Sequence, residues 1–107
     1  MNIAVCDDQL EELKAVESLL RAWQEQQCAA IRLHLFHNAG ELLEAARKER
    51  FTLYLLDVMM PGTSGMAAAR EIRTFDSAAD IVFLTSYYNK FGQESRAASP
   101  AFFPSNA

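Results

Sequence analysis

Short apolar runs recur along the chain and predict strands. Three of them are almost unbroken and lie at residues 3–6, 51–56 and 81–84. Such runs are typical of strands that are buried on both faces of a sheet. Residues 31–36 instead alternate apolar and polar side chains, which indicates a half-exposed strand near a sheet edge. The pattern therefore predicts four strands, with the second near an edge.

Longer stretches between these runs carry apolar residues at helical spacing. Steps of three, four and one predict an amphipathic helix over residues 10–23. Asp8 and Glu11 resemble a capping box at the start of this helix. Asn38 and Glu41 have the same spacing and predict the start of a second helix.

A third helix is expected over residues 66–74, after a turn-rich loop at residues 61–65. Strands that alternate with helices are typical of parallel strands joined by right-handed crossovers. The order of elements therefore predicts an α/β sandwich, although it does not fix the strand order.

The pattern weakens after residue 85. A helix over residues 89–98 is an open alternative, because this segment carries few apolar residues besides its alanines and one phenylalanine. Residues 99–107 contain two prolines, and residues 101–103 are expected to form a short fifth strand with no helix after it.

Composition narrows the class of protein. The chain has 107 residues and is 50% hydrophobic, which suits one domain with a core. Its net charge of −4 and scattered basic residues argue against a nucleic-acid surface. No apolar run approaches the ~20 residues that span a bilayer, and no secretion signal is visible, so we expect a cytoplasmic protein without a membrane segment. Cys6 lies in a predicted buried strand, where it is expected to act as a small hydrophobic residue rather than in a disulfide.

Acidic and hydroxyl residues stand at the carboxyl ends of the apolar strands. Asp7 and Asp8 follow the first strand, Asp57 follows the third, and Thr85 follows the fourth. In an open parallel sheet, ligands bind along the edge where these ends lie. If the first and third strands are neighbours, three carboxylates converge there, and a hard divalent cation relieves their repulsion.

Mg²⁺ suits such a site, since it is usually held by one or two carboxylates and by phosphate oxygens or water. It would neutralise an incoming phosphoryl group and leave one carboxylate to attack phosphorus. Asp57 is the better nucleophile, because it ends the most buried strand, and Thr85 would donate its hydroxyl to a phosphoryl oxygen. Taken singly, each residue also has a structural interpretation: Asp8 as a helix cap, Asp57 as a turn cap and Thr85 as a strand residue.

Three segments together resemble receiver domains of two-component response regulators. They read Val-Cys-Asp-Asp at residues 5–8, Leu-Leu-Asp-Val-Met-Met-Pro-Gly-Thr-Ser-Gly at residues 55–65, and Ile-Val-Phe-Leu-Thr-Ser at residues 81–86. The resemblance runs in order from residue 2 to about residue 88. Val-Cys-Asp-Asp and Phe-Leu-Thr-Ser look most like the receivers of LytTR-type regulators.

This resemblance implies a flavodoxin-like (CheY-like) fold with five parallel strands in the order 2-1-3-4-5 and helices on both faces. It implies that Asp57 is phosphorylated by a sensor histidine kinase and that Thr85 is the switch hydroxyl. Asp8 and Asp57 would bind Mg²⁺ directly, together with the main-chain carbonyl of Met59, and Asp7 would act mostly through water. The function implied is a phosphorylation switch, for transcription through an output domain outside this chain, and not an enzyme with an external substrate.

The chain departs from the family near its end. Receivers carry a lysine at the end of the fifth strand, at a position that falls near Ser105 here, and no lysine follows Lys90. The last family helix is missing as well. We therefore expect residues 1–107 to form one receiver domain that is truncated or atypical after about residue 98. The uncovered sheet would expose apolar surface, which favours a homodimer or exchange of a segment.

Two other functions stay open. Without the lysine, the chain would be a degenerate receiver that only binds proteins or dimerises. A Mg²⁺-dependent phosphatase of the haloacid dehalogenase type also uses an aspartate at a strand end. That family needs a second aspartate two residues later, where this chain has Met59, so turnover is not expected.

Overall fold

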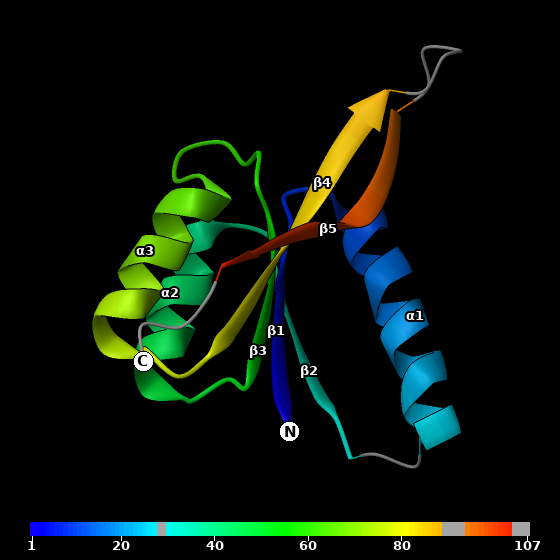
Figure 1. Cartoon of the computed structure of the whole chain (residues 1–107), viewed down its shortest axis with the longest axis horizontal. Helices are drawn as coiled ribbons and strands as arrows, with labels where there is room; N and C mark the ends of the chain where they lie inside the picture. The colour runs from blue at the N-terminus through cyan, green and yellow to red at the C-terminus, as the bar shows by residue number, and fades with distance from the viewer. Residues whose placement is uncertain (28–29, 89–93, 104–107) are drawn as a thin grey trace.

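The computed structural model describes residues 1–27, 30–88 and 94–103, and the side chains of these residues as far as residue 84. Strands and helices alternate along most of the chain (Figure 1). The elements in order are β1 (Asn2–Cys6), α1 (Leu10–Gln27), β2 (Arg32–Phe36), α2 (Ala39–Lys48), β3 (Leu53–Asp57), α3 (Gly65–Phe75), β4 (Asp80–Tyr88) and β5 (Glu94–Phe103).

The strands form one sheet in the order β2-β1-β3-β4-β5. The first four are parallel: β1 pairs with β2 and β3, and β3 pairs with β4. The expected strand order is therefore confirmed. The strand with the alternating pattern, β2, stands at an edge, as its sequence indicates, and the apolar strand β3 lies in the middle of the sheet.

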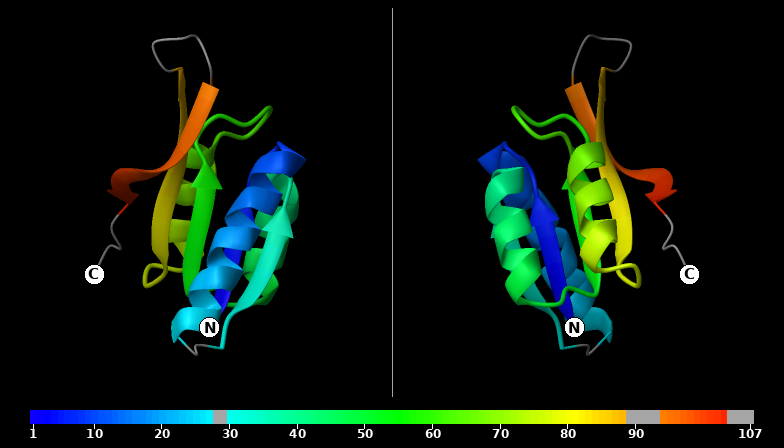
Figure 2. Two further views of the ribbon diagram at one scale, coloured as in Figure 1. Left: turned by 90° about the vertical axis from the view of Figure 1, so that its right-hand side faces the viewer. Right: turned by 90° about the vertical axis from the view of Figure 1, so that its left-hand side faces the viewer.

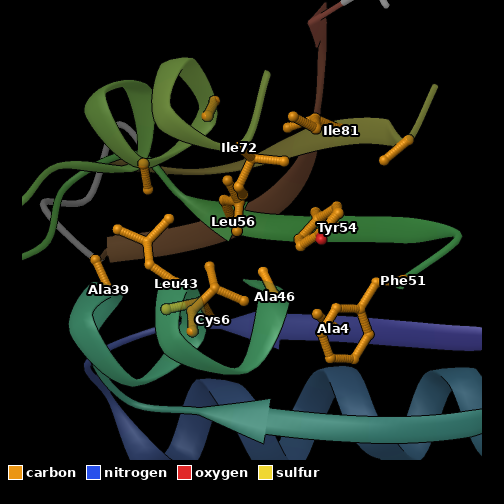
Figure 3. Packing of buried hydrophobic residues seen from close by; sticks show 14 of the residues in the cluster. Ala4, Cys6, Ala39, Leu43, Ala46, Phe51, Tyr54, Leu56, Ile72 and Ile81 are labelled. Atoms are coloured by element: carbon orange, nitrogen blue, oxygen red, sulfur yellow. The ribbon is translucent and has the colours of Figure 1, made fainter. Parts of the chain in front are cut away.

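Helices cover both faces of the sheet, and successive strand residues divide between the two layers. Ile3 and Val5 of β1 belong to the cluster under α1, whereas Ala4 and Cys6 belong to the cluster under α2 and α3. Figure 3 shows the second cluster, to which the fully buried Tyr54 of β3 belongs. The period of two along each strand thus builds a core on each side.

The face that carries α1 is covered over only part of its width. In the left view of Figure 2, α1 stands in front of one half of the sheet, while β3 and β4 lie beside it without a helix in front. Leu53 and Leu55 of β3 are only partly buried on this face. On α1 itself, Leu19 and Trp23 are 72% and 44% exposed. Helix α1 therefore carries exposed apolar side chains, and the sheet carries apolar side chains that are only partly buried.

Two of the three helix starts follow simple capping. The side chain of Asn38 accepts the backbone N–H of Glu41 at 2.8 Å, which confirms the predicted start of α2. Ser64 caps α3 in the same way, by accepting the N–H of Ala67. Helix α1 instead begins at Leu10, one residue later than an Asp8 cap predicts. The reason is that Asp7 accepts the N–H of Gln9 and holds that residue outside the helix.

The C-terminal part differs from the expected parallel strand. Strand β4 continues to Tyr88, well beyond residues 81–84, and β5 is ten residues long and antiparallel to β4. The alternative of a helix is wrong for residues 94–98, whereas residues 89–93 lie outside the described chain. A parallel crossover needs a dozen residues or more, but only five separate β4 from β5, which is compatible with the antiparallel pairing alone. Within the described residues, α3 is the last helix, and none of the helices there is long and apolar enough to cross a membrane.

Candidate metal centre

Three carboxylates from distant parts of the chain meet at one edge of the sheet. Asp7 and Asp8 follow β1, and Asp57 is the last residue of β3. Because β1 and β3 are parallel neighbours, their carboxyl ends lie side by side. One carboxylate oxygen from each of the three residues lies within 4.8 Å of the others. Asp7 and Asp57 are buried, at 0% and 1% exposure, while Asp8 is exposed, so the cluster reaches solvent on one side.

Asp7 is held by the elements on either side of it. Its backbone N–H donates to the carbonyl of Phe36 at the end of β2, at 3.0 Å. Its side-chain Oδ1 accepts the backbone N–H of Gln9 at 2.9 Å, just before α1 begins. The same carboxylate therefore helps to set the start of α1 and the position of the acidic cluster.

Asp57 is fixed by β4 and by the loop that follows β3. Its register partner in β4 is Leu84, whose carbonyl accepts the backbone N–H of Val58 at 3.2 Å. The N–H of Met59 donates to Asp57 Oδ1 at 3.3 Å, which places the backbone of Met59 against the carboxylate cluster. Strand end and loop thus fix Asp57 together.

Two glycines shape the segment after Asp57, which we call the β3–α3 loop (residues 58–64). Gly62 has a φ of +78°, a backbone conformation that residues other than glycine rarely adopt. Gly65, the first residue of α3, packs so tightly that a Cβ there would lie 2.1 Å from the main-chain oxygen of Asp57. The sequence indicates a turn at both glycines, but it does not show this close approach of α3 to the end of β3.

The donor set suits a hard divalent cation. All three groups are carboxylates, which Mg²⁺ prefers. Oxygens that share a Mg²⁺ at about 2.1 Å stand about 3 to 4 Å apart, which is compatible with the spacing of the cluster. Buried carboxylates at this spacing repel one another strongly, and a cation offsets that cost. The residues present therefore fit the ion that the sequence predicts.

Thr85 does not end its strand. It lies inside β4, one residue beyond the register partner of Asp57, and its own partner is Ala97 of β5. The backbone of Thr85 is thus brought to the edge that carries the cluster, while its side chain lies outside the described part. The position near Ser105, where receivers carry a lysine, also lies outside it. The role of Thr85 stays a prediction.

A sulfur pair lies next to the acidic cluster. Cys6, directly before Asp7, is buried and free, as predicted, and its thiol donates to Met60 Sδ at 3.6 Å. Burial, and then the charges of Asp7 and Asp57, raise the pKa of Cys6 to about 12. The thiol is therefore a protonated packing group rather than a nucleophile. The contact with Met60 was not foreseen, because it joins segments that are 54 residues apart.

The comparisons with known proteins agree on one family. Residues 3–98 match the family model described as the response regulator receiver domain. The chain is similar to the transcriptional regulatory protein ZraR of Klebsiella oxytoca, with 30% identity over 87 residues, which cover 81% of this chain and 18% of that protein. It is 44% identical over 50 residues to the transcriptional regulatory protein YkoG of Bacillus subtilis, covering 47% of this chain and 22% of that one.

Solved structures give the same picture. The BeF3-activated receiver domain of DrrB superposes with a TM-score of 0.67 at 28% identity, covering 84% of this chain and 69% of that one. This chain spans only about a fifth of the length of the two curated relatives named above.

Proposed function

Since this chain belongs to the response regulator receiver family, we propose that it is a phosphorylation switch of a two-component system. Asp57 would accept the phosphoryl group, and a sensor histidine kinase would supply it. The observation that carries this proposal is the meeting of Asp7, Asp8 and Asp57 within 4.8 Å, at the end of a parallel strand pair.

The proposed roles follow from the positions of the residues. Asp8 and Asp57 would hold Mg²⁺ together with the main-chain carbonyl of Met59, and Asp7 would contact it mostly through water. When bound, the ion supplies positive charge for the phosphoryl oxygens. A carboxylate oxygen of Asp57 attacks phosphorus, the bond to the kinase histidine breaks, and an acyl phosphate forms on Asp57. Thr85 would donate its hydroxyl to a phosphoryl oxygen, and slow hydrolysis would reset the switch.

The same proposal covers the wider organisation. Residues 1–107 would form one receiver domain, atypical after about residue 98. Its relatives named above are transcriptional regulators several times longer, which supports a transcriptional output outside this chain. The LytTR type of that output is proposed from the Val-Cys-Asp-Asp and Phe-Leu-Thr-Ser segments alone. The chain would have no external substrate and so would not be an enzyme in the usual sense.

Acetyl phosphate tests the acceptor without a kinase. Wild-type protein with Mg²⁺ should gain the mass of one phosphoryl group, and both Asp57→Asn and removal of Mg²⁺ with EDTA should abolish the gain. Asp8→Asn should weaken Mg²⁺ binding. The matched control is Asp80→Asn, an exposed aspartate that pairs with Leu53 at the opposite end of β3, and it should label like wild type. Equal labelling of Asp57→Asn and wild type would refute the proposal.

A binding-only receiver is the second candidate, and the absence of any lysine after Lys90 favours it. No mass gain in the folded wild-type protein would support this alternative. The phosphatase alternative is tested with Mg²⁺ and a chromogenic phosphate ester. We expect no turnover, because Met59 stands where the acid/base aspartate is needed.

We also propose that the chain associates with a second copy, either as a homodimer or by exchange of a segment. The exposed Leu19 and Trp23 of α1, and the part of the sheet beside α1 that has no helix in front, support this proposal. The edge strand β5 offers a further place for pairing.

A further inference from the structure

Between its two ends, the β3–α3 loop is anchored to the protein interior by one buried side chain. Between residues 59 and 63, Met59 is 77% exposed, and Pro61, Gly62 and Thr63 are exposed as well. Met60 is only 8% exposed and belongs to the core cluster under α2 and α3. This loop also carries the backbone of Met59, which lies against the acidic cluster. The position of that backbone therefore depends on how firmly Met60 is seated.

Met60 contacts Cys6 in the core, and we call Cys6 the seat of Met60. The thiol of Cys6 donates to Met60 Sδ at 3.6 Å, and Cys6 has no exposed surface. In Figure 3, Cys6 points from β1 into the core, toward the side covered by α2. Cys6 comes directly before Asp7, and Met60 comes directly after Met59. One buried contact therefore joins the two segments that build the site.

Further restraints on this loop lie at its two ends, where Val58 also packs against the same core cluster. The N–H of Met59 donates to Asp57 Oδ1 at 3.3 Å, and the N–H of Gly65 donates to the carbonyl of Val58 at 3.1 Å. These bonds fix where the loop leaves β3 and enters α3, but neither ties it to β1. A methionine suits the task, since its unbranched thioether fills irregular gaps and makes sulfur contacts.

We propose that Met60, seated on Cys6, is a positioning residue that holds the β3–α3 loop against β1 and so sets the backbone of Met59 relative to Asp7 and Asp57. The metal part of this inference rests on the proposed function. The anchoring part does not, because it follows from the contact alone. Met60 touches neither the phosphoryl group nor the ion, and it acts through the loop.

Four variants separate positioning from general stability. Met60→Ala removes the anchor, and Met60→Leu keeps an apolar side chain of similar volume. Cys6→Ala removes the seat. Ile81→Ala is the matched control, because Ile81 is fully buried in the same core cluster but lies away from the site. It is in β4 and pairs with Tyr54, and Tyr54 precedes Asp57 by three residues in β3. Two quantities are measured: hydrogen exchange of the loop amides relative to those of β1, and Mg²⁺ affinity by calorimetry.

Met60→Ala should speed exchange of the loop amides selectively and weaken Mg²⁺ binding on the order of tenfold, as loss of an outer support does at metal sites. Met60→Leu should restore both. Ile81→Ala should lower the stability of the whole fold and keep Mg²⁺ affinity within about twofold of wild type. In the Cys6→Ala background, Met60→Ala should weaken Mg²⁺ binding by no more than a further factor of about two, since the seat is already gone.

Wild-type loop exchange in Met60→Ala would overturn the anchoring. An effect of Met60→Ala that is equally large with and without Cys6 would overturn the role of Cys6. A wild-type protein that binds no Mg²⁺ would overturn the proposed function and the metal part of this inference, and the exchange measurement would still decide the anchoring.

Discussion

Replacing Gly65 by alanine puts a methyl group where the structure leaves no room for it. The added Cβ would lie 2.1 Å from the main-chain oxygen of Asp57, 2.9 Å from its carbonyl carbon and 3.1 Å from Val58 Cα. All three atoms belong to the backbone, so no side chain can rotate away. Gly65, unlike Gly62, does not have a positive φ, so the obstacle at Gly65 is space and not backbone conformation.

The size of the effect follows from these distances. Ordinary contact at a Cβ begins at 3.4 Å, so the start of α3 and the end of β3 must separate by about 1.3 Å, the difference between 3.4 and 2.1 Å. Forcing a methyl group into a packed site costs ~1–3 kcal/mol, and the better helix propensity of alanine returns at most ~1 kcal/mol. We therefore expect Gly65→Ala to lower the free energy of unfolding by about 1–2 kcal/mol.

The effect on phosphorylation should be larger than the effect on stability. Asp57 itself provides the atoms that must move, and a misplacement of about 1 Å at a reacting group can cost ~100-fold in rate. The rate of labelling by acetyl phosphate should therefore fall by about 100-fold. It is measured by intact mass at pH 7 in the absence of denaturant. Urea unfolding of the same variant gives the stability change.

Gly40→Ala is the matched control for Gly65→Ala. Gly40 also lies in the first turn of a helix, but the nearest atom to an added Cβ is the side-chain Oδ1 of Asn38 at 3.4 Å. This variant should label at the wild-type rate and be as stable as wild type or up to ~1 kcal/mol more stable. A Gly65→Ala protein with wild-type stability and labelling would show that α3 does not constrain Asp57, and the reasoning would fail.

Three further predictions concern stability and assembly. Burial, and then the charge of Asp76, raise the pKa of Tyr54 from 10.0 to about 12, so the folded state keeps this proton where the unfolded state has lost it. Stability should fall by about 2 kcal/mol from this group between pH 10 and pH 12, and Tyr54→Phe should remove that part of the loss in alkaline urea titrations. Asn38→Ala should lower the free energy of unfolding by ~1 kcal/mol in urea, because it removes the cap of α2, and an unchanged value would contradict the capping. Light scattering should show a dimer mass that reverts to the monomer in Leu19→Glu, whereas a wild-type monomer at high concentration would contradict the proposed association.

The sequence was informative where one local pattern decides one structural property. The unbroken run at residues 51–56 indicated a strand buried on both faces; β3 is the middle strand of the sheet, but Leu53 and Leu55 are only partly buried on the face that carries α1. The alternation at residues 31–36 indicated an edge, and β2 stands there. Neither pattern carries the strand order, which came from the resemblance to receivers. The strand order depends on pairings between distant segments, and a run of apolar residues does not indicate which other strand it pairs with.

The candidate site was predictable for a related reason. Parallel strands bring their carboxyl ends to one edge, so aspartates at the ends of β1 and β3 had to meet if these strands were neighbours. Contacts of atoms were not predictable in this way. The capping pattern pointed to Asp8, whereas Asp7 accepts the N–H of Gln9. The tight approach of Gly65 to Asp57 also depends on where α3 packs, which no spacing along the chain records.

The direction of β5 changes what the missing lysine means. In a parallel arrangement the fifth strand would end beside Asp57, and a lysine following it would reach the acidic cluster. Here β5 starts opposite Tyr88 and ends with Phe103 opposite Ile81, near the start of β4. The last described residue of β5 therefore lies at the end of the sheet away from the carboxylates, whereas a parallel fifth strand would end on their side. Under the proposed function, a cation bound by the acidic cluster would then supply the positive charge for a phosphoryl group at Asp57.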